Sequence, residues 1–103
     1  MTATPAIPQG ASLIFVGRTA VEAHTLPDES VLLFDGDTGT AIPVNECAGK
    51  IWEMCNGAHT VDQIVDNLAA HYDAERIDID RDTREFLAIL ARHGFIDRVS
   101  FPR

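Results

Sequence analysis

Residues 44–57 read Val-Asn-Glu-Cys-Ala-Gly-Lys-Ile-Trp-Glu-Met-Cys-Asn-Gly, and the pattern of apolar residues changes here. From Asn45 onward the apolar residues recur about every 3.6 positions, which is the period of an α-helix. Asn45 is a good N-cap, and Gly57 suits the left-handed conformation that ends many helices. The apolar stripe of this predicted helix consists of Ala48, Ile51, Trp52 and Cys55.

Two more helices are predicted downstream. Residues 60–63, Thr-Val-Asp-Gln, form a capping box, and apolar residues continue at helical spacing to Tyr72. Asp80 is a plausible N-cap for the third helix, and Gly94 is placed to end it before Phe95 and Ile96. The inner face of the third helix would consist of Thr83, Phe86, Leu87 and Leu90.

The residues before position 44 favour strands. Residues 31–34, Val-Leu-Leu-Phe, and residues 40–44 flank a turn rich in Gly and Asp, which predicts a β-hairpin. Pro43 has no amide hydrogen for a ladder bond, so the return strand is expected at a sheet edge with this position facing away from its neighbour. Residues 13–16 and 21–26 are weaker strand candidates.

The whole chain fits one α+β domain, with strands first and helices second. Its 103 residues are 46% apolar and 23% charged, as in a globular protein, and no apolar run approaches the length of a membrane span. We expect a loose arm at 1–12, the domain at 13–98 and a tail at 99–103. Because the N-terminus lacks the pattern of a secretory signal, we expect a cytoplasmic protein without membrane association.

The spacing of several motifs together resembles the PqqD family. Residues 44–57 are similar to that family's strand-to-helix segment, in which a hydrophobic-Asn pair opens a helix that runs through Ile51-Trp52 to a glycine. Thr60-Val61 and Ile64 look like its Thr-Val-x-x-Ile capping segment, and Phe86-Leu87 with Leu90 and Gly94 resembles its last helix. The resemblance covers about residues 30–97.

The resemblance implies a winged helix-turn-helix-like domain with a three-stranded antiparallel sheet followed by three helices. It also implies a non-catalytic peptide chaperone, a RiPP recognition element, that binds the leader of a ribosomally made precursor peptide. The leader would add a strand to residues 40–44 and then be presented to a modifying enzyme, often a radical S-adenosylmethionine enzyme. The turn at 35–40 is longer than in proteins of the quinone pathway, so the broad family fits better than that pathway.

The residues expected to contact the leader are Thr40, Ala41, Ile42, Pro43 and Val44 in the strand, and Arg84, Phe86, Leu87, Ile89 and Leu90 in the third helix. Most apolar residues at helical spacing are core residues, and this alternative applies to Phe86, Leu87 and Leu90. Ile89 lies off the core stripe, where a charged residue would be normal, and this hints at a contact surface. The sequence does not decide whether the Phe86–His93 edge or the Arg84–Ala88 edge of the helix faces the strand.

No catalytic or metal site stands out in the sequence. Cys47, Cys55 and His59 are too few and too widely spaced for structural zinc, so the thiols are expected to pack as small hydrophobic groups. Cys47 and Cys55 would lie about 12 Å apart along one helix, which is too far for a disulfide. We therefore expect no cofactor and no enzymatic activity.

The net charge of −8 disfavours nucleic-acid partners and favours basic or mixed ones. Acidic residues gather between Asp73 and Glu85, where they would suit the N-terminus of a helix or steer a basic leader. The main alternative function is a winged-helix DNA-binding regulator, because Arg81, Arg84 and Arg92 lie on the third helix. A structural subunit is a third class, and the open strand edge would also allow a homodimer.

Overall fold

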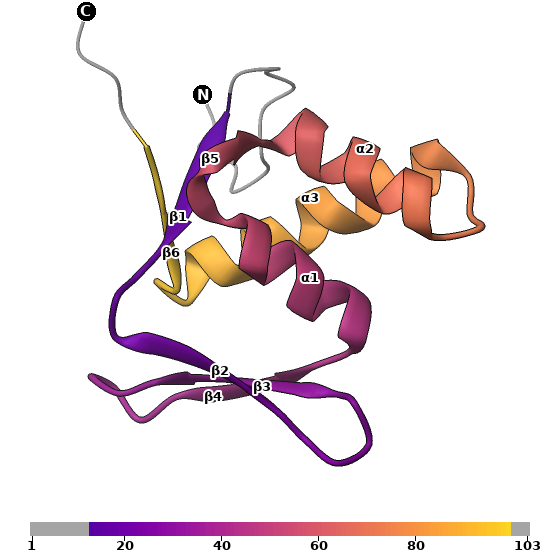
Figure 1. Cartoon of the computed structure of the whole chain (residues 1–103). Coiled ribbons are helices and arrows are strands. Elements are labelled where there is room, and N and C mark those ends of the chain that lie inside the picture. The colour runs from indigo at the N-terminus through magenta and orange to yellow at the C-terminus, as the bar shows by residue number, and fades with distance from the viewer. Residues whose placement is uncertain (1–12, 100–103) are drawn as a thin grey trace, which may run out of the picture.

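The computed structural model describes residues 13–99 and places three helices on one side of a small antiparallel sheet (Figure 1). This sheet has the order β2-β3-β4, built from Val21–Thr25, Val31–Asp35 and Ala41–Val44. The expected three-stranded antiparallel sheet and its hairpin are thus confirmed. The predicted arm at 1–12 and residues 100–103 of the predicted tail lie outside the described residues.

A second sheet was not expected from the sequence. β1 (Ile14–Gly17) lies between β5 (Asn56–Thr60) and β6 (Ile96–Arg98), and both pairings are antiparallel. β5 interrupts the helical half of the chain between α1 and α2, and β6 follows α3. The prediction of strands first and helices second therefore describes the sheet β2-β3-β4 correctly but is incomplete.

The three helices are α1 (Glu46–Met54), α2 (Val61–His71) and α3 (Arg76–Arg92). Asn45 caps α1 by accepting a hydrogen bond from the Ala48 amide at 2.8 Å. Thr60 and Gln63 form the predicted capping box of α2. Both predicted N-termini are confirmed.

Two predicted helix boundaries were wrong. α1 ends at Met54 rather than near Gly57, and Cys55 is its C-cap; Gly57 has the predicted positive φ of 82° but lies in β5. α3 starts at Arg76, with Glu75 as the N-cap, so Asp80 lies inside the helix. The Asp80 carboxylate accepts from the Arg84 guanidinium one turn later, at 3.1 Å, instead of capping the helix.

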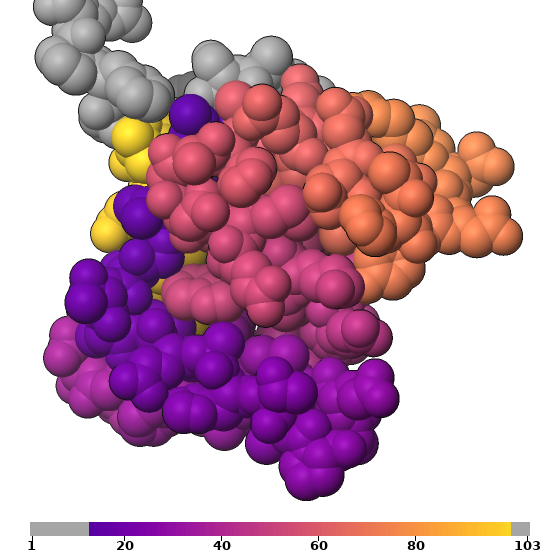
Figure 2. Space-filling model, viewed as in Figure 1, coloured from indigo at the N-terminus to yellow at the C-terminus, as the bar shows by residue number. Residues whose placement is uncertain are grey.

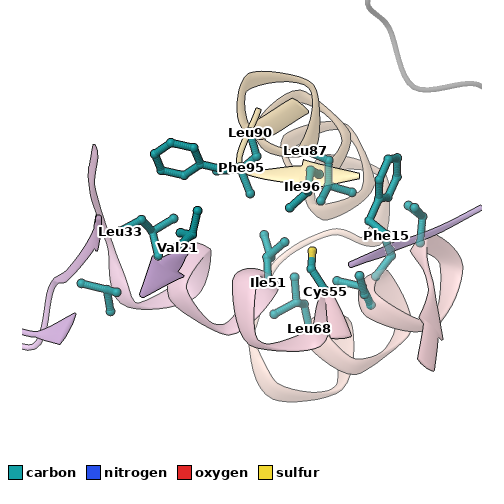
Figure 3. Close-up of a cluster of buried hydrophobic side chains, with 14 residues drawn as sticks. Phe15, Val21, Leu33, Ile51, Cys55, Leu68, Leu87, Leu90, Phe95 and Ile96 are labelled. Atoms are coloured by element: carbon teal, nitrogen blue, oxygen red, sulfur yellow. The ribbon is translucent and has the colours of Figure 1, made fainter. Parts of the chain in front are cut away.

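One hydrophobic core joins the sheet and the helices (Figure 3). Leu33 of β3, Leu68 of α2, Leu87 and Leu90 of α3 and Phe95 are at most 1% exposed. Gly49 lets α1 approach β3 closely, because a Cβ atom at this position would lie 2.8 Å from a methyl carbon of Val31. Figure 2 shows the strand-rich part of the molecule at its lower margin, with no helix beneath it.

Candidate functional site

β4 is an edge strand of its sheet. It pairs with β3 through Val31↔Val44, Leu32↔Pro43, Leu33↔Ile42 and Phe34↔Ala41. The Thr40 carbonyl accepts from the Asp35 amide at 2.9 Å, so the backbone groups of Thr40, Ile42 and Val44 point toward β3. The backbone groups of Ala41 and Pro43 point away from β3. Within residues 13–99 no strand pairs with that outer side. Pro43 therefore lies where a missing amide costs no bond to β3, as the sequence predicted.

The side chains of β4 alternate between the two faces of the sheet. Ile42 and Val44 are half-buried and pack against the core on the helix side, whereas Ala41 and Pro43 are exposed on the outer face. Their partners Leu33 and Val31 on the neighbouring strand are buried. The apolar surface of the sheet therefore continues to its open edge, where it is only partly covered.

α3 lies on the helix side of the sheet and runs in the opposite direction to this edge strand (Figure 1). At one end, the Arg18 guanidinium lies 3.3 Å from both the Asp35 carboxylate, in β3, and the Gly94 carbonyl, just after α3. At the other end, Cys47 follows β4, and its pKa is raised by burial first and then by Asp82 of α3 and by Glu46. The two ends of the segment from Asp82 to Gly94 thus lie near the two ends of the stretch from Asp35 to Cys47.

The ion pairs of Arg84 show which edge of α3 faces the strand. The Arg84 side chain is 11% exposed and is held by Asp80 and, at 3.1 Å, by Asp62 of α2. The edge of α3 that carries Arg84 and Ala88 thus faces α2. The opposite edge, with Phe86, Ile89 and His93, lies on the side of Asp82 and β4.

Six of the expected contact residues fall into two groups by exposure. Ile42, Val44 and Phe86 are half-buried, and Ile89 is 40% exposed, so a ligand could reach these side chains. Leu87 and Leu90 are fully buried in the core, beneath the surface that a ligand would reach. They position α3 under this edge, in keeping with the alternative that they are core residues.

Sequence reasoning missed Arg18 and Asp35, which hold one end of this site. Asp35 is a fully buried carboxylate at the end of an apolar strand. Because a buried carboxylate requires a cation or several hydrogen-bond donors, its position directly after Val31–Phe34 was a usable signal. The partner Arg18 lies 17 positions away and has no such local signal.

Cys47 and Cys55 are free thiols in different environments. Cys55 is buried, and burial raises its pKa to about 12. His59 contacts Asn56 through Nδ1 at 3.1 Å. Within residues 13–99 the structure shows no group of three or more His, Cys, Asp or Glu side chains arranged to hold a metal ion.

The linings of two hollows include no residue of β4. One, of about 590 Å³, is lined by Val16, Gly17, Arg18, Thr19, Ala20, Asp37 and Asp97. The other, of about 230 Å³, lies between the β2–β3 hairpin and α1 and is lined mainly by polar residues. Strand addition requires unpaired backbone groups rather than a cavity, so the edge β4 is the better candidate site. Among the described helices, none combines the length and apolar character needed to cross a bilayer.

Known proteins resemble this chain in sequence and in fold. The family model described as coenzyme PQQ synthesis protein D (PqqD) matches residues 30–96. A curated relative from Rhodopseudomonas palustris (strain TIE-1), named PqqA binding protein, is 36% identical over 95 residues, which cover 92% of this chain and 82% of the relative.

Two solved structures share the architecture. TbiB1 in complex with the TbiA(beta) leader peptide is 27% identical, with a TM-score of 0.70 over 84% of this chain and 99% of that chain. The PqqD truncation of Methylobacterium extorquens PqqCD, described as a stand-alone RiPP recognition element, has a TM-score of 0.74 at 22% identity, covering 91% of this chain and 98% of that one. The fold is therefore that of a small α+β domain of the RiPP recognition type. The chain belongs to the PqqD family.

Proposed function

We propose that this protein is a non-catalytic adaptor that binds the leader of a ribosomally made precursor peptide by adding it as a fourth strand beside β4. The observation that carries the proposal is that no strand within residues 13–99 pairs with the outer side of β4, whose side chains Ile42 and Val44 are half-buried against the core. Backbone groups of Ala41 and the Pro43 carbonyl would pair with the guest, and its alternate side chains would pack on Ile42 and Val44.

The relatives support a peptide as the ligand. The curated relatives are named PqqA binding proteins, and two structural neighbours were solved with a leader peptide. In this proposal the guest strand lies along Thr40, Ala41, Ile42, Pro43 and Val44. Its backbone pairs with Ala41 and Pro43, and its side chains pack on Ile42, Val44, Phe86 and Ile89. Arg84, Leu87 and Leu90 support the contact surface from within the fold.

The partner of the bound complex would be a modifying enzyme of the radical S-adenosylmethionine class, acting in the cytoplasm. In this scheme the adaptor holds the leader and leaves the rest of the precursor free for the enzyme. The same open edge would accept a second copy of the chain, because two identical edge strands can pair across a twofold axis. A homodimer of this kind would compete with the peptide.

The charges of α3 favour a peptide over DNA. Arg84 is bound by Asp62 and Asp80, and Arg81 contacts Asp78 at 3.1 Å and Asp82 at 3.5 Å. Arg81 and Arg84 could contact phosphates only after breaking these ion pairs. The net charge of −8 also opposes the approach of a duplex.

Isothermal titration tests the proposal directly. Synthetic PqqA peptide from Rhodopseudomonas palustris and any precursor peptide encoded next to this chain are titrated into the purified full chain, with a scrambled peptide as the control. We expect 1:1 binding of at least one natural peptide at micromolar or lower concentration. If the natural and scrambled peptides behave alike, the adaptor function is wrong.

A further inference from the structure

Arg18 connects three segments that are distant in sequence. Its Nη1 lies 3.3 Å from the Asp35 carboxylate and 3.3 Å from the Gly94 carbonyl, and its Nη2 lies 3.0 Å from the Asp37 carboxylate. Its backbone amide donates to the Phe95 carbonyl at 2.9 Å. We call this set of contacts the Arg18 bridge. It joins the β1–β2 connection, the β3–β4 turn and the end of α3.

The turn side of the Arg18 bridge fixes where β4 begins. The Asp35 side chain is fully buried, and it accepts from the Asp37 amide at 2.8 Å. The backbone amide of Asp35 donates to the Thr40 carbonyl at 2.9 Å, immediately before the edge strand. The position of Asp35 therefore determines the position of the first residues that would receive a guest strand.

The helix side of the Arg18 bridge fixes the end of α3. Gly94 has a φ of 74°, a conformation that favours glycine, and it follows His93 on the edge of α3 that faces β4. The Gly94 carbonyl accepts from Arg18 Nη1. This one guanidinium nitrogen therefore contacts both Asp35, at the end of β3, and Gly94, just after α3. Both sides of the candidate site are held by the same side chain.

We propose that Arg18 is a positioning residue that sets the distance between β4 and α3, and through it the affinity for a strand-adding peptide. This proposal rests on the proposed function. A guest strand must pair with the β4 backbone and pack its side chains on α3 at the same time, so its affinity depends on the width of the gap. A gap that is already set in the free protein lowers the ordering cost of binding. Arg18 acts without contacting the peptide.

The first test is a double-mutant cycle between Arg18 and the peptide side chains that face α3. Two alanine versions of the PqqA peptide are first compared, one with its odd and one with its even apolar positions replaced. The version that loses more affinity is the helix-face alanine peptide, and it enters the cycle beside the natural peptide. We expect Arg18→Met to lower the affinity for the natural peptide about tenfold, a size typical of the coupling between residues in one network. Arg18→Met should lower the affinity for the helix-face alanine peptide far less, because that peptide binds through β4 alone.

Two further variants control for stability. Arg76→Met removes an exposed arginine that pairs with Asp66 of α2, away from β4, and should leave peptide affinity unchanged. Arg18→Lys keeps the positive charge near Asp35 but cannot reach all three acceptors, so it should recover part of the affinity. An equal loss of affinity for both peptides would show a general structural role and would overturn the proposal.

The second test needs no peptide, so it separates this proposal from the proposed function. Spin labels are attached to Ala41→Cys and Arg92→Cys in a Cys47→Ser background, and Cys55 stays unlabelled because it is buried. Pulsed electron paramagnetic resonance should give one narrow distance in the parent protein and a broader or shifted distribution with Arg18→Met. Arg76→Met should not change it. An unchanged distribution with Arg18→Met would contradict the spacing role, whereas absence of peptide binding by the parent would contradict the proposed function alone.

Discussion

Leu33 and Ile42 lie opposite each other across the β3–β4 ladder, and Leu33 is fully buried whereas Ile42 is only half-buried. The two side chains share one face of the sheet, so coverage by the helices decreases toward the open edge. A guest strand beside β4 would bring its own side chains next to Ile42 and extend the buried surface. Peptide binding by strand addition depends on this partly covered edge of the core.

Ile89 and Ile77 provide a matched pair on α3. Ile89 is 40% exposed on the edge that faces β4, and Ile77 is 75% exposed near the start of the helix. We expect Ile89→Asp to weaken peptide binding about tenfold or more, because it places a carboxylate against apolar guest side chains. Ile77→Asp should have little effect in the same titration. Equal affinities of the two variants would remove this edge of α3 from the site.

Pro43 limits the number of hydrogen bonds that β4 offers. Its position faces the open side, so Pro43→Ala would add an outward amide without changing the bonds to β3. One additional backbone hydrogen bond is expected to contribute about 1 kcal/mol, or roughly a fivefold gain in peptide affinity. Light scattering should also show more self-association. A loss of affinity without self-association would argue against an outward-facing position.

Cys55 makes stability depend on pH in the alkaline range. Burial raises its pKa from 9.0 to about 12, so between these values the unfolded chain loses the thiol proton while the folded chain keeps it. Stability should therefore fall as pH rises above 9, by about 1.4 kcal/mol per pH unit from this group. Below pH 9 the thiol is protonated in both states and contributes no slope.

The contribution of Cys55 is isolated by comparing urea unfolding of the wild type and Cys55→Ala between pH 8 and 10.5. The alanine variant lacks the thiol, so the difference in unfolding free energy between the two proteins should shrink above pH 9. Parallel pH profiles would show that Cys55 is accessible to water in the folded protein.

Thr60 should contribute to stability through the capping box of α2. Its Oγ1 accepts from the Gln63 amide at 3.1 Å, and Gln63 Oε1 accepts from the Thr60 amide at 2.8 Å. Thr60→Ala is expected to lower the free energy of unfolding by about 1 kcal/mol. Thr19→Ala, at an exposed position, should change it by less than about 0.5 kcal/mol. Chemical denaturation of both variants checks this difference.

Local signals predicted those parts of the fold that depend on neighbouring residues. The caps at Asn45 and Thr60 and the hairpin across residues 35–40 each have their determinants within a few positions. β6 has only three residues and exists because it pairs with β1 about 80 positions earlier, which no local pattern reveals. The early start of α3 also depends on a partner outside the helix, because Arg76 forms an ion pair with Asp66 of α2.

The candidate site was predictable to the same extent. Pro43 indicated the edge strand, and Ile89 stood out as an apolar residue off the core stripe. The contact between Arg84 and Asp62 of α2 determines which edge of α3 faces β4, and the sequence does not reveal that contact. The Arg18 bridge requires residues 18, 35 and 94 together, and this arrangement exists only in the folded chain.

Hydrogen exchange at the Ala41 amide tests strand addition most directly. This amide points away from β3, so it should exchange quickly in the free protein, whereas the Ile42 amide points toward β3 in both states. On saturation with PqqA peptide, we predict that exchange at Ala41 slows by at least about tenfold while Ile42 changes little. Unchanged exchange at Ala41, together with new protection on β2 or β6, would contradict peptide binding at the β4 edge.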